Sequence, residues 1–165
     1  MECKPFKRYF NTYHNVLLYK IFLKAPWEPE NKIRATLEEA MEIIRQASNI
    51  SGGMPQIVYL VGWQFLGHDS KYPAWSEVGK HCFYKDCPDP LTSLRTMMRD
   101  AMKQYNVKVS LHINMDDATE DSPLWPEYKA RNLINIDEKG AMQSGGVWGG
   151  GMTYEISKTR EWECG

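Results

Sequence analysis

The sequence predicts an α/β protein built like the start of a (β/α) barrel. Three apolar segments of strand length alternate with two amphipathic helical segments, in the order strand, helix, strand, helix, strand. This alternation is typical of a parallel sheet with right-handed crossovers. The third strand carries polar residues on one face, which suits the lumen of a barrel better than a face covered by helices. We therefore favour a (β/α) barrel over a doubly wound sheet.

The second strand gives the strongest single signal in the chain. Residues 57–61 form a continuous apolar run bounded by Pro55 and Gly62, as expected for a strand that is buried on both faces. In α/β folds the functional residues lie just beyond the carboxyl ends of the strands. The segment after this strand occupies that place, and it contains Trp63, Gln64, His68 and Asp69.

The two flanking strands are predicted over residues 16–23 and 107–114. In the first, Lys20 interrupts the apolar run, which is costly unless its ammonium group is paired or points into a polar cavity. The strand over residues 107–114 alternates with period two, so that its apolar face should pack against outer helices. Its polar face should line the inside of a barrel, and it consists of Lys108, Ser110, His112 and Asn114.

Two amphipathic helices are predicted between the strands. The first begins with a capping box formed by Thr36 and Glu39 and ends near residues 51–53. The second has Asp89 as its N-cap and Pro90 in its first turn, and it runs to Tyr105. Because each helix connects two successive strands, both should serve as crossover helices of one parallel sheet.

The regular alternation stops after Met115. We expect an acidic loop over residues 116–121, a short helix over 123–131, extended pieces over 133–136 and 147–156 with a turn at 137–140, and a last helix capped by Ser157. The expected architecture is a single domain over residues 1–165, with the first three strands of a TIM-type barrel and a C-terminal extended or hairpin segment. A full barrel takes about 250 residues, so the chain is either part of a larger protein or completes its sheet by association.

The charge and hydropathy of the chain argue against two classes of partner. The formal net charge of −1 gives no basic excess of the kind that nucleic-acid binding requires. No apolar run approaches the roughly 18 residues that a membrane span needs. The first ten residues contain basic side chains without an apolar core after them, so they do not form a secretory signal.

The residues after the second and third strands point to a sugar-binding site. An aromatic face covers the apolar side of a pyranose ring, while carboxylates, amides and imidazoles bind its hydroxyl groups. Trp63, Gln64, His68 and Asp69 offer this combination, and His112, Asn114 and Asp116 lie two apart on one strand face. For the last three, hydrogen bonding to a polar ligand is favoured over metal binding because a third protein ligand is absent. We therefore predict neither a metal nor a cofactor.

Two further motifs have simpler interpretations. The glycine-rich segment 145–151 lacks the Gly-Lys-Ser/Thr ending of a phosphate-binding loop and is expected to be a connection. The acidic residues at 116, 117, 120 and 121 are adjacent on one segment, whereas glycoside hydrolysis needs two carboxylates on opposite sides of the scissile bond. We therefore assign no catalytic residue.

Residues 56–115 resemble the barrel domain of the endo-α-N-acetylgalactosaminidase family of glycoside hydrolases. That family has a strand ending in a Gly-His-Asp-Ser turn, matched here by residues 67–70, and then a strand ending in His-x-Asn, matched by residues 112–114. The resemblance implies a retaining hydrolase that acts on α-linked N-acetylgalactosamine glycans. It implies that His68 and Asp69 hold the sugar in the subsite that is cleaved, and that His112 and Asn114 line the same pocket. The family's nucleophile and general acid lie on later strands, without counterparts here.

The resulting hypothesis is a carbohydrate-active protein that carries the sugar-binding half of a glycoside hydrolase site and binds a glycan or a glycoprotein sugar. The alternative is a non-catalytic carbohydrate-binding or assembly protein built on a barrel fragment. The resemblance suggests a secreted or cell-surface location. Because three strands cannot close a barrel, the open sheet edges should either cause self-association or be covered by residues 133–156.

Overall fold

The computed structural model describes residues 13–29, 32–148 and 151–157. A 3-10 turn at Tyr13–Asn15 precedes a three-stranded sheet formed by β1 (Leu17–Phe22), β2 (Gln56–Val61) and β3 (Val107–Leu111). All strands are parallel and lie in the order β1-β2-β3. The predicted adjacency and direction of the three strands are therefore confirmed. The third strand is shorter than predicted, because it ends before His112.

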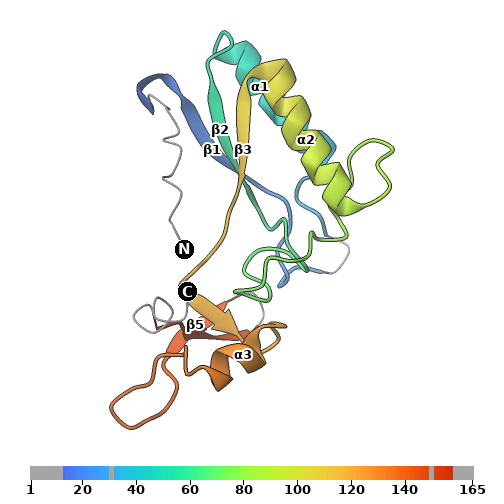
Figure 1. The fold of residues 1–165 in the computed structure, drawn as a ribbon. Coiled ribbons are helices and arrows are strands. Elements are labelled where there is room, and N and C mark those ends of the chain that lie inside the picture. The colour runs from blue at the N-terminus through green and yellow to red at the C-terminus, as the bar shows by residue number, and fades with distance from the viewer. Residues whose placement is uncertain (1–12, 30–31, 149–150, 158–165) are drawn as a thin grey trace, which may run out of the picture.

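The two crossover helices, α1 (Leu37–Ile50) and α2 (Pro90–Tyr105), lie on the same face of this sheet (Figure 1). One buried cluster joins them to the strands, with Ile44 from α1, Met97 from α2 and Val58 from β2 among its members. A doubly wound sheet would have helices on both faces. The observed arrangement is that of part of a TIM-type barrel, in which the other face of the sheet forms the lumen.

The lumen face of the sheet is polar in its middle, as the sequence predicts. Lys20 of β1 pairs in register with Tyr59 of β2, which pairs with Ser110 of β3. None of the three is fully buried. Val107 and Val109 point the other way and belong to the cluster beneath the helices. The interruption at Lys20 thus follows from its place on the uncovered face.

Local capping fixes where each helix begins. The backbone amide of Glu39 donates to the Thr36 hydroxyl over 3.1 Å, and the Thr36 amide donates to the Glu39 carboxylate over 2.8 Å. The Asp89 carboxylate accepts from the Thr92 amide over 2.8 Å at the start of α2. Each of these bonds satisfies an amide that the helix itself leaves without a partner. Both predicted N-caps are confirmed.

The C-terminal part forms a second, antiparallel sheet. It consists of β4 (Asp117–Thr119), β5 (Ser144–Trp148) and β6 (Gly151–Glu155) in the order β4-β6-β5, with α3 (Trp125–Ala130) beside it. The acidic loop predicted over residues 116–121 is therefore wrong in part, because residues 117–119 pair with β6. The glycine-rich segment contributes to both β5 and β6 rather than serving only as a connection. The helix expected after Ser157 lies outside the described residues.

The second sheet is attached to the carboxyl-terminal end of the first. Thr119 of β4 donates to the carbonyl oxygen of Tyr72 through its amide over 2.9 Å and its hydroxyl over 3.3 Å. The expectation that residues 133–156 cover the edges of the parallel sheet is wrong, because this segment pairs with β4 and with itself. Among the described residues, no helix has the length and apolar character needed to cross a membrane.

The outer edges of β1 and β3 have no strand partner within the described part of the chain. Unpaired backbone groups on such edges recruit other strands, and the exposed Leu18 adds apolar surface on β1. We therefore expect the 165-residue chain to self-associate at low micromolar concentration, which sedimentation velocity would measure. A single monomeric species over that concentration range would contradict this expectation.

Candidate functional site

The site lies where the carboxyl ends of the three parallel strands meet. Phe22 pairs with Val61, and Leu60 pairs with Leu111, so the chain leaves all three strands at the same edge of the sheet. His68 and Asp69 lie on the loop after β2, and His112 follows β3 directly. Parallel pairing therefore brings together side chains that are more than forty positions apart in the sequence.

The loop after β2 is held by the backbone that follows β1. The carbonyl oxygen of Lys24 accepts from the His68 amide over 2.9 Å. Gly62 and Gly67 both have positive φ and both lie against this carbonyl, so that a Cβ atom at either position would collide with it. The backbones of the two loops can approach this closely only because both residues are glycines.

The position of His112 is fixed by bonds from β2 and from the loop after it. The His112 amide donates to the carbonyl oxygen of Leu60 over 2.9 Å. Its own carbonyl oxygen accepts from the indole nitrogen of Trp63 over 2.9 Å. Trp63 is almost completely buried, so its indole is a rigid support for the backbone that presents the His112 side chain.

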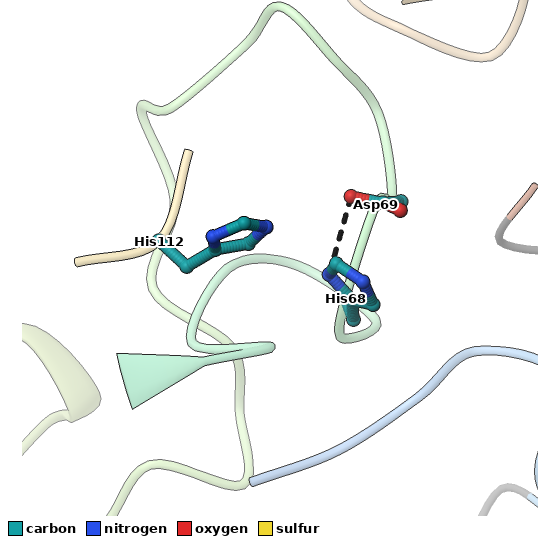
Figure 2. A group of neighbouring side chains, drawn as sticks. All are labelled: His68, Asp69 and His112. Atoms are coloured by element: carbon teal, nitrogen blue, oxygen red, sulfur yellow. Dashed lines mark ion pairs between the residues drawn. The ribbon is translucent and has the colours of Figure 1, made fainter. Parts of the chain in front are cut away.

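The side chains of His68, Asp69 and His112 face one another (Figure 2). His68 Nδ1 lies 3.1 Å from Asp69 Oδ1, without the alignment of a hydrogen bond. The centroids of the two imidazole rings are 5.1 Å apart. Asp69 adopts φ 57°, in the left-handed region that residues other than glycine rarely occupy. Backbone conformations of this kind are concentrated at functional sites.

The three side chains open onto a hollow of about 640 Å³ that is also lined by residues 113–117. Within this segment, Asn114 Nδ2 donates to Asp117 Oδ2 over 2.6 Å, and the Asp116 amide donates to Asn114 Oδ1 over 2.8 Å. Asn114 thereby orders the segment between the two sheets. The hollow combines imidazole, amide and carboxylate groups, and it is large enough for one sugar residue.

Aromatic rings from β1 and from the loop after it contact His68. The rings of Phe22 and Trp27 contact the His68 ring edge to face, with centroids 5.3 Å and 5.8 Å away. The Trp27 side chain is about half exposed, at 51%. An exposed indole beside polar groups is the feature with which sugar sites bind the apolar face of a pyranose.

Burial and nearby charges keep both histidines neutral at neutral pH. Desolvation lowers the pKa of His68, and the nearby His112 and Lys20 lower it further, although the Asp69 carboxylate opposes them. Desolvation also lowers the pKa of His112, with a further contribution from Lys20. A neutral imidazole donates a hydrogen bond at one nitrogen and accepts at the other, as recognition of a hydroxyl group requires.

Two acidic groups next to the histidines hold their protons more tightly than usual. Desolvation raises the pKa of Asp117, and the carboxylates of Asp69 and Asp116 add to the increase. Tyr72 is fully buried, and desolvation followed by the Asp69 charge raises the pKa of its hydroxyl group. The raised pKa keeps the Tyr72 hydroxyl group neutral next to the Asp69 carboxylate.

The structure brings together five of the seven residues that the sequence predicts for the site. His68, Asp69, His112, Asn114 and Asp116 all line the hollow. Trp63 and Gln64 do not line it, because their side chains are buried with exposures of 4% and 0%. The expectation that the indole of Trp63 faces the ligand is therefore not met in this conformation.

The sequence interpretation omitted Trp27, Phe22 and Tyr72. Trp27 and Phe22 lie at or just after the carboxyl end of β1, so the rule that assigns function to strand ends could have identified them. Tyr72 had no comparable signal, because its contact with the site depends on the fold of the long loop after β2. His112, Asn114 and Asp116 were expected on one strand face, but β3 ends at Leu111, so they line the hollow from the segment that follows the strand.

No protein-family profile matches the chain, and no curated protein matches it in sequence. Its fold does match solved structures. An α-N-acetylgalactosaminidase from Bifidobacterium bifidum aligns with 86% of this chain and 22% of its own length, at a TM-score of 0.62 and 16% identity. An α-galactosidase from Thermus thermophilus aligns with 86% of this chain and 24% of its own length, at a TM-score of 0.55 and 14% identity.

An α-amylase from Lactobacillus plantarum gives a third match, at a TM-score of 0.57 and 13% identity. The alignment covers 90% of this chain and 33% of the length of the amylase. The chain shares its fold with part of each of these enzymes. It spans about a quarter to a third of the length of these enzymes. The first two matches act on α-linked N-acetylgalactosamine or galactose, as their names state.

Gly62 provides a test of the backbone contact that positions the site. Replacing Gly62 with Ala forces a Cβ atom into the carbonyl oxygen of Lys24 at a positive φ. Gly52→Ala is the matched control, since Gly52 also has positive φ but has nothing within 4 Å of the added atom. We expect Gly62→Ala to lower the free energy of unfolding by about 1–3 kcal/mol more than the control, which is the typical cost of overpacking.

Chemical denaturation of the two variants beside the unaltered chain measures this difference. Equal losses of stability in Gly62→Ala and Gly52→Ala would show that the two loops do not pack as described.

Proposed function

We propose that the chain carries the sugar-binding half of a glycoside hydrolase site and binds glycans containing α-linked N-acetylgalactosamine. The observation that carries this proposal is the meeting of His68, Asp69 and His112 at the carboxyl ends of three parallel strands, beside a hollow of about 640 Å³. In barrels of this type that end is where ligands bind. The 165 residues would then correspond to the first part of the barrel, folded as one domain.

The chemistry of the side chains supports a neutral, hydroxyl-rich ligand. The Asp69 carboxylate can accept hydrogen bonds from two hydroxyl groups, and each neutral imidazole can donate one bond and accept another. Trp27 supplies an exposed indole next to His68. Polar groups that bind hydroxyls on one side and an aromatic ring on the other are what a pyranose requires.

The identity of the sugar rests on two separate arguments. The Gly-His-Asp-Ser and His-x-Asn segments resemble those of the endo-α-N-acetylgalactosaminidase family. Independently of those motifs, the fold matches an α-N-acetylgalactosaminidase that has been solved in complex with N-acetylgalactosamine. We therefore take N-acetylgalactosamine as the first ligand to test.

Asp69 is the residue whose loss should weaken sugar binding most clearly. Asp69→Ala removes a charged acceptor from the hollow, and hydrogen bonds to charged groups contribute about 1.5–3 kcal/mol. Titration of N-acetylgalactosamine by NMR should show a weakening of that size. The control is Asp121→Ala, because Asp121 is an exposed carboxylate away from the hollow. Equal affinities of the two variants, or no binding by the unaltered chain, would contradict the proposal.

Binding without cleavage is the outcome we expect of the chain alone. Asp116 and Asp117 are neighbours at the start of one strand, and Asn114 holds the Asp117 carboxylate. They are therefore poorly placed to flank a glycosidic bond from opposite sides, as hydrolysis demands. Incubation with an activated α-N-acetylgalactosaminide should release no sugar above background. Robust release that disappears in Asp69→Ala or Asp116→Ala would show that the chain contains its own catalytic pair.

The alternative function, a non-catalytic binding or assembly protein, is favoured by the two unpaired sheet edges. The two functions predict different results when the chain is mixed with polypeptide segments that supply the remaining strands of a barrel. Recovery of hydrolysis on such completion supports the enzyme, whereas sugar binding that remains without hydrolysis supports the binding protein.

A further inference from the structure

The three side chains that face one another in the hollow also form a compact set of metal donors. One nitrogen of His68, one nitrogen of His112 and one carboxylate oxygen of Asp69 all lie within 4.8 Å of one another (Figure 2). Two imidazoles and one carboxylate are the donor set that binds zinc and neighbouring transition metals. Within the part of the chain that the structure describes, no other group of three such side chains meets in this way.

Hydrogen bonds hold the backbone at both histidines before any ion binds. The His68 amide is bonded to the Lys24 carbonyl, and the His112 amide is bonded to the Leu60 carbonyl, each over 2.9 Å. The indole nitrogen of Trp63 donates a hydrogen bond to the carbonyl oxygen of His112. A metal site on a backbone held in this way loses less conformational entropy when it is filled, which favours binding.

The surrounding charges also favour a cation. Asp116 and Asp117 line the same hollow as Asp69, which places three carboxylates near the position of the ion. The positive charge of Lys20 lowers the pKa of both histidines. This single charge offsets only part of the negative charge of the three carboxylates. The hollow is open toward solvent, so an ion can enter and keep water or another oxygen ligand.

We propose that His68, Asp69 and His112 bind one divalent transition-metal ion of the zinc class, with at least one coordination position left open toward the hollow. Bonds of about 2.0–2.2 Å to a tetrahedral ion place the donors about 3.3–3.6 Å apart. The cluster reaches that spacing through small rotations of side chains that already face one another. The inference goes beyond the proposed sugar binding and does not rest on it, although metal and sugar would compete for the same donors.

The histidine resonances of the unaltered chain provide a test that needs no substitution. The sequence contains four histidines, at positions 14, 68, 81 and 112. We expect Zn²⁺ added to the full chain to shift the imidazole nitrogens of His68 and His112 in long-range proton–nitrogen spectra. Neither His14 nor His81 belongs to a group of three such donors among the described residues, and His81 is bonded to the carbonyl oxygen of Gly62, so their signals should shift far less. Signals of His68 and His112 that do not move would overturn the proposal.

Calorimetric titration with Zn²⁺ then measures the contribution of each donor. Because thiols also bind zinc, the titrations use a background in which Cys3, Cys87 and Cys164 are replaced by serine. We expect one ion per chain, and an affinity that falls more than about tenfold in His68→Ala, Asp69→Asn and His112→Ala, since even outer-shell changes cost that much. His14→Ala is the control and should bind as the background does.

Zinc binding that is unchanged in His112→Ala would overturn the proposal, as would the absence of saturable binding. Circular dichroism of each variant shows whether it is folded. Where a variant does not fold, the proton–nitrogen spectra of the unaltered chain decide whether His68 and His112 bind zinc. Zinc binding without any sugar binding would contradict only the proposed function. Sugar binding without zinc binding would contradict only this inference.

Discussion

The parallel register of β1, β2 and β3 is the constraint on which the site depends. It places Phe22 beside Val61 and Leu60 beside Leu111, so that three loops begin at one edge of the sheet. The Lys24 carbonyl then joins the first two loops through the His68 amide, and glycines at 62 and 67 leave room for it. Every group in the hollow depends on this backbone contact or on β3. A change in register by one residue would turn alternate side chains to the opposite face of the sheet and separate the histidines.

The strands, the crossover helices and most of the site follow from patterns that are local in sequence. The capping box at Thr36 and the N-cap at Asp89 mark the helix starts, and both act as predicted. The handedness and adjacency of β-α-β connections then fix the order of the strands without any tertiary information. Because parallel strands share their carboxyl ends, the place of His68, Asp69 and His112 follows from topology. This is why the sequence could predict their convergence before any contact was known.

The parts that escaped prediction depend on contacts between distant segments. Residues 117–119 were expected to form a loop because they are acidic, but they pair with β6, more than thirty positions later. Trp63 was expected at the ligand because it lies beyond the end of β2, but it follows Gly62 with its positive φ and packs into the core beneath the helices. Trp27 lies in a loop with no regular period, so only the chain's path beyond β1 brings it to His68. In each case the decisive interaction is tertiary, and it leaves no periodic signal in the sequence.

The groups gathered at the carboxyl ends of the parallel strands act together on a single ligand. Intermolecular nuclear Overhauser effects between N-acetylgalactosamine and the chain, labelled in its histidine rings, test this claim most directly. The account predicts contacts from the protons of one sugar molecule to the rings of both His68 and His112, whose centroids lie 5.1 Å apart. The absence of contacts to both rings would contradict this claim. Contacts to only one ring, together with contacts that place the sugar elsewhere on the chain, would also contradict it.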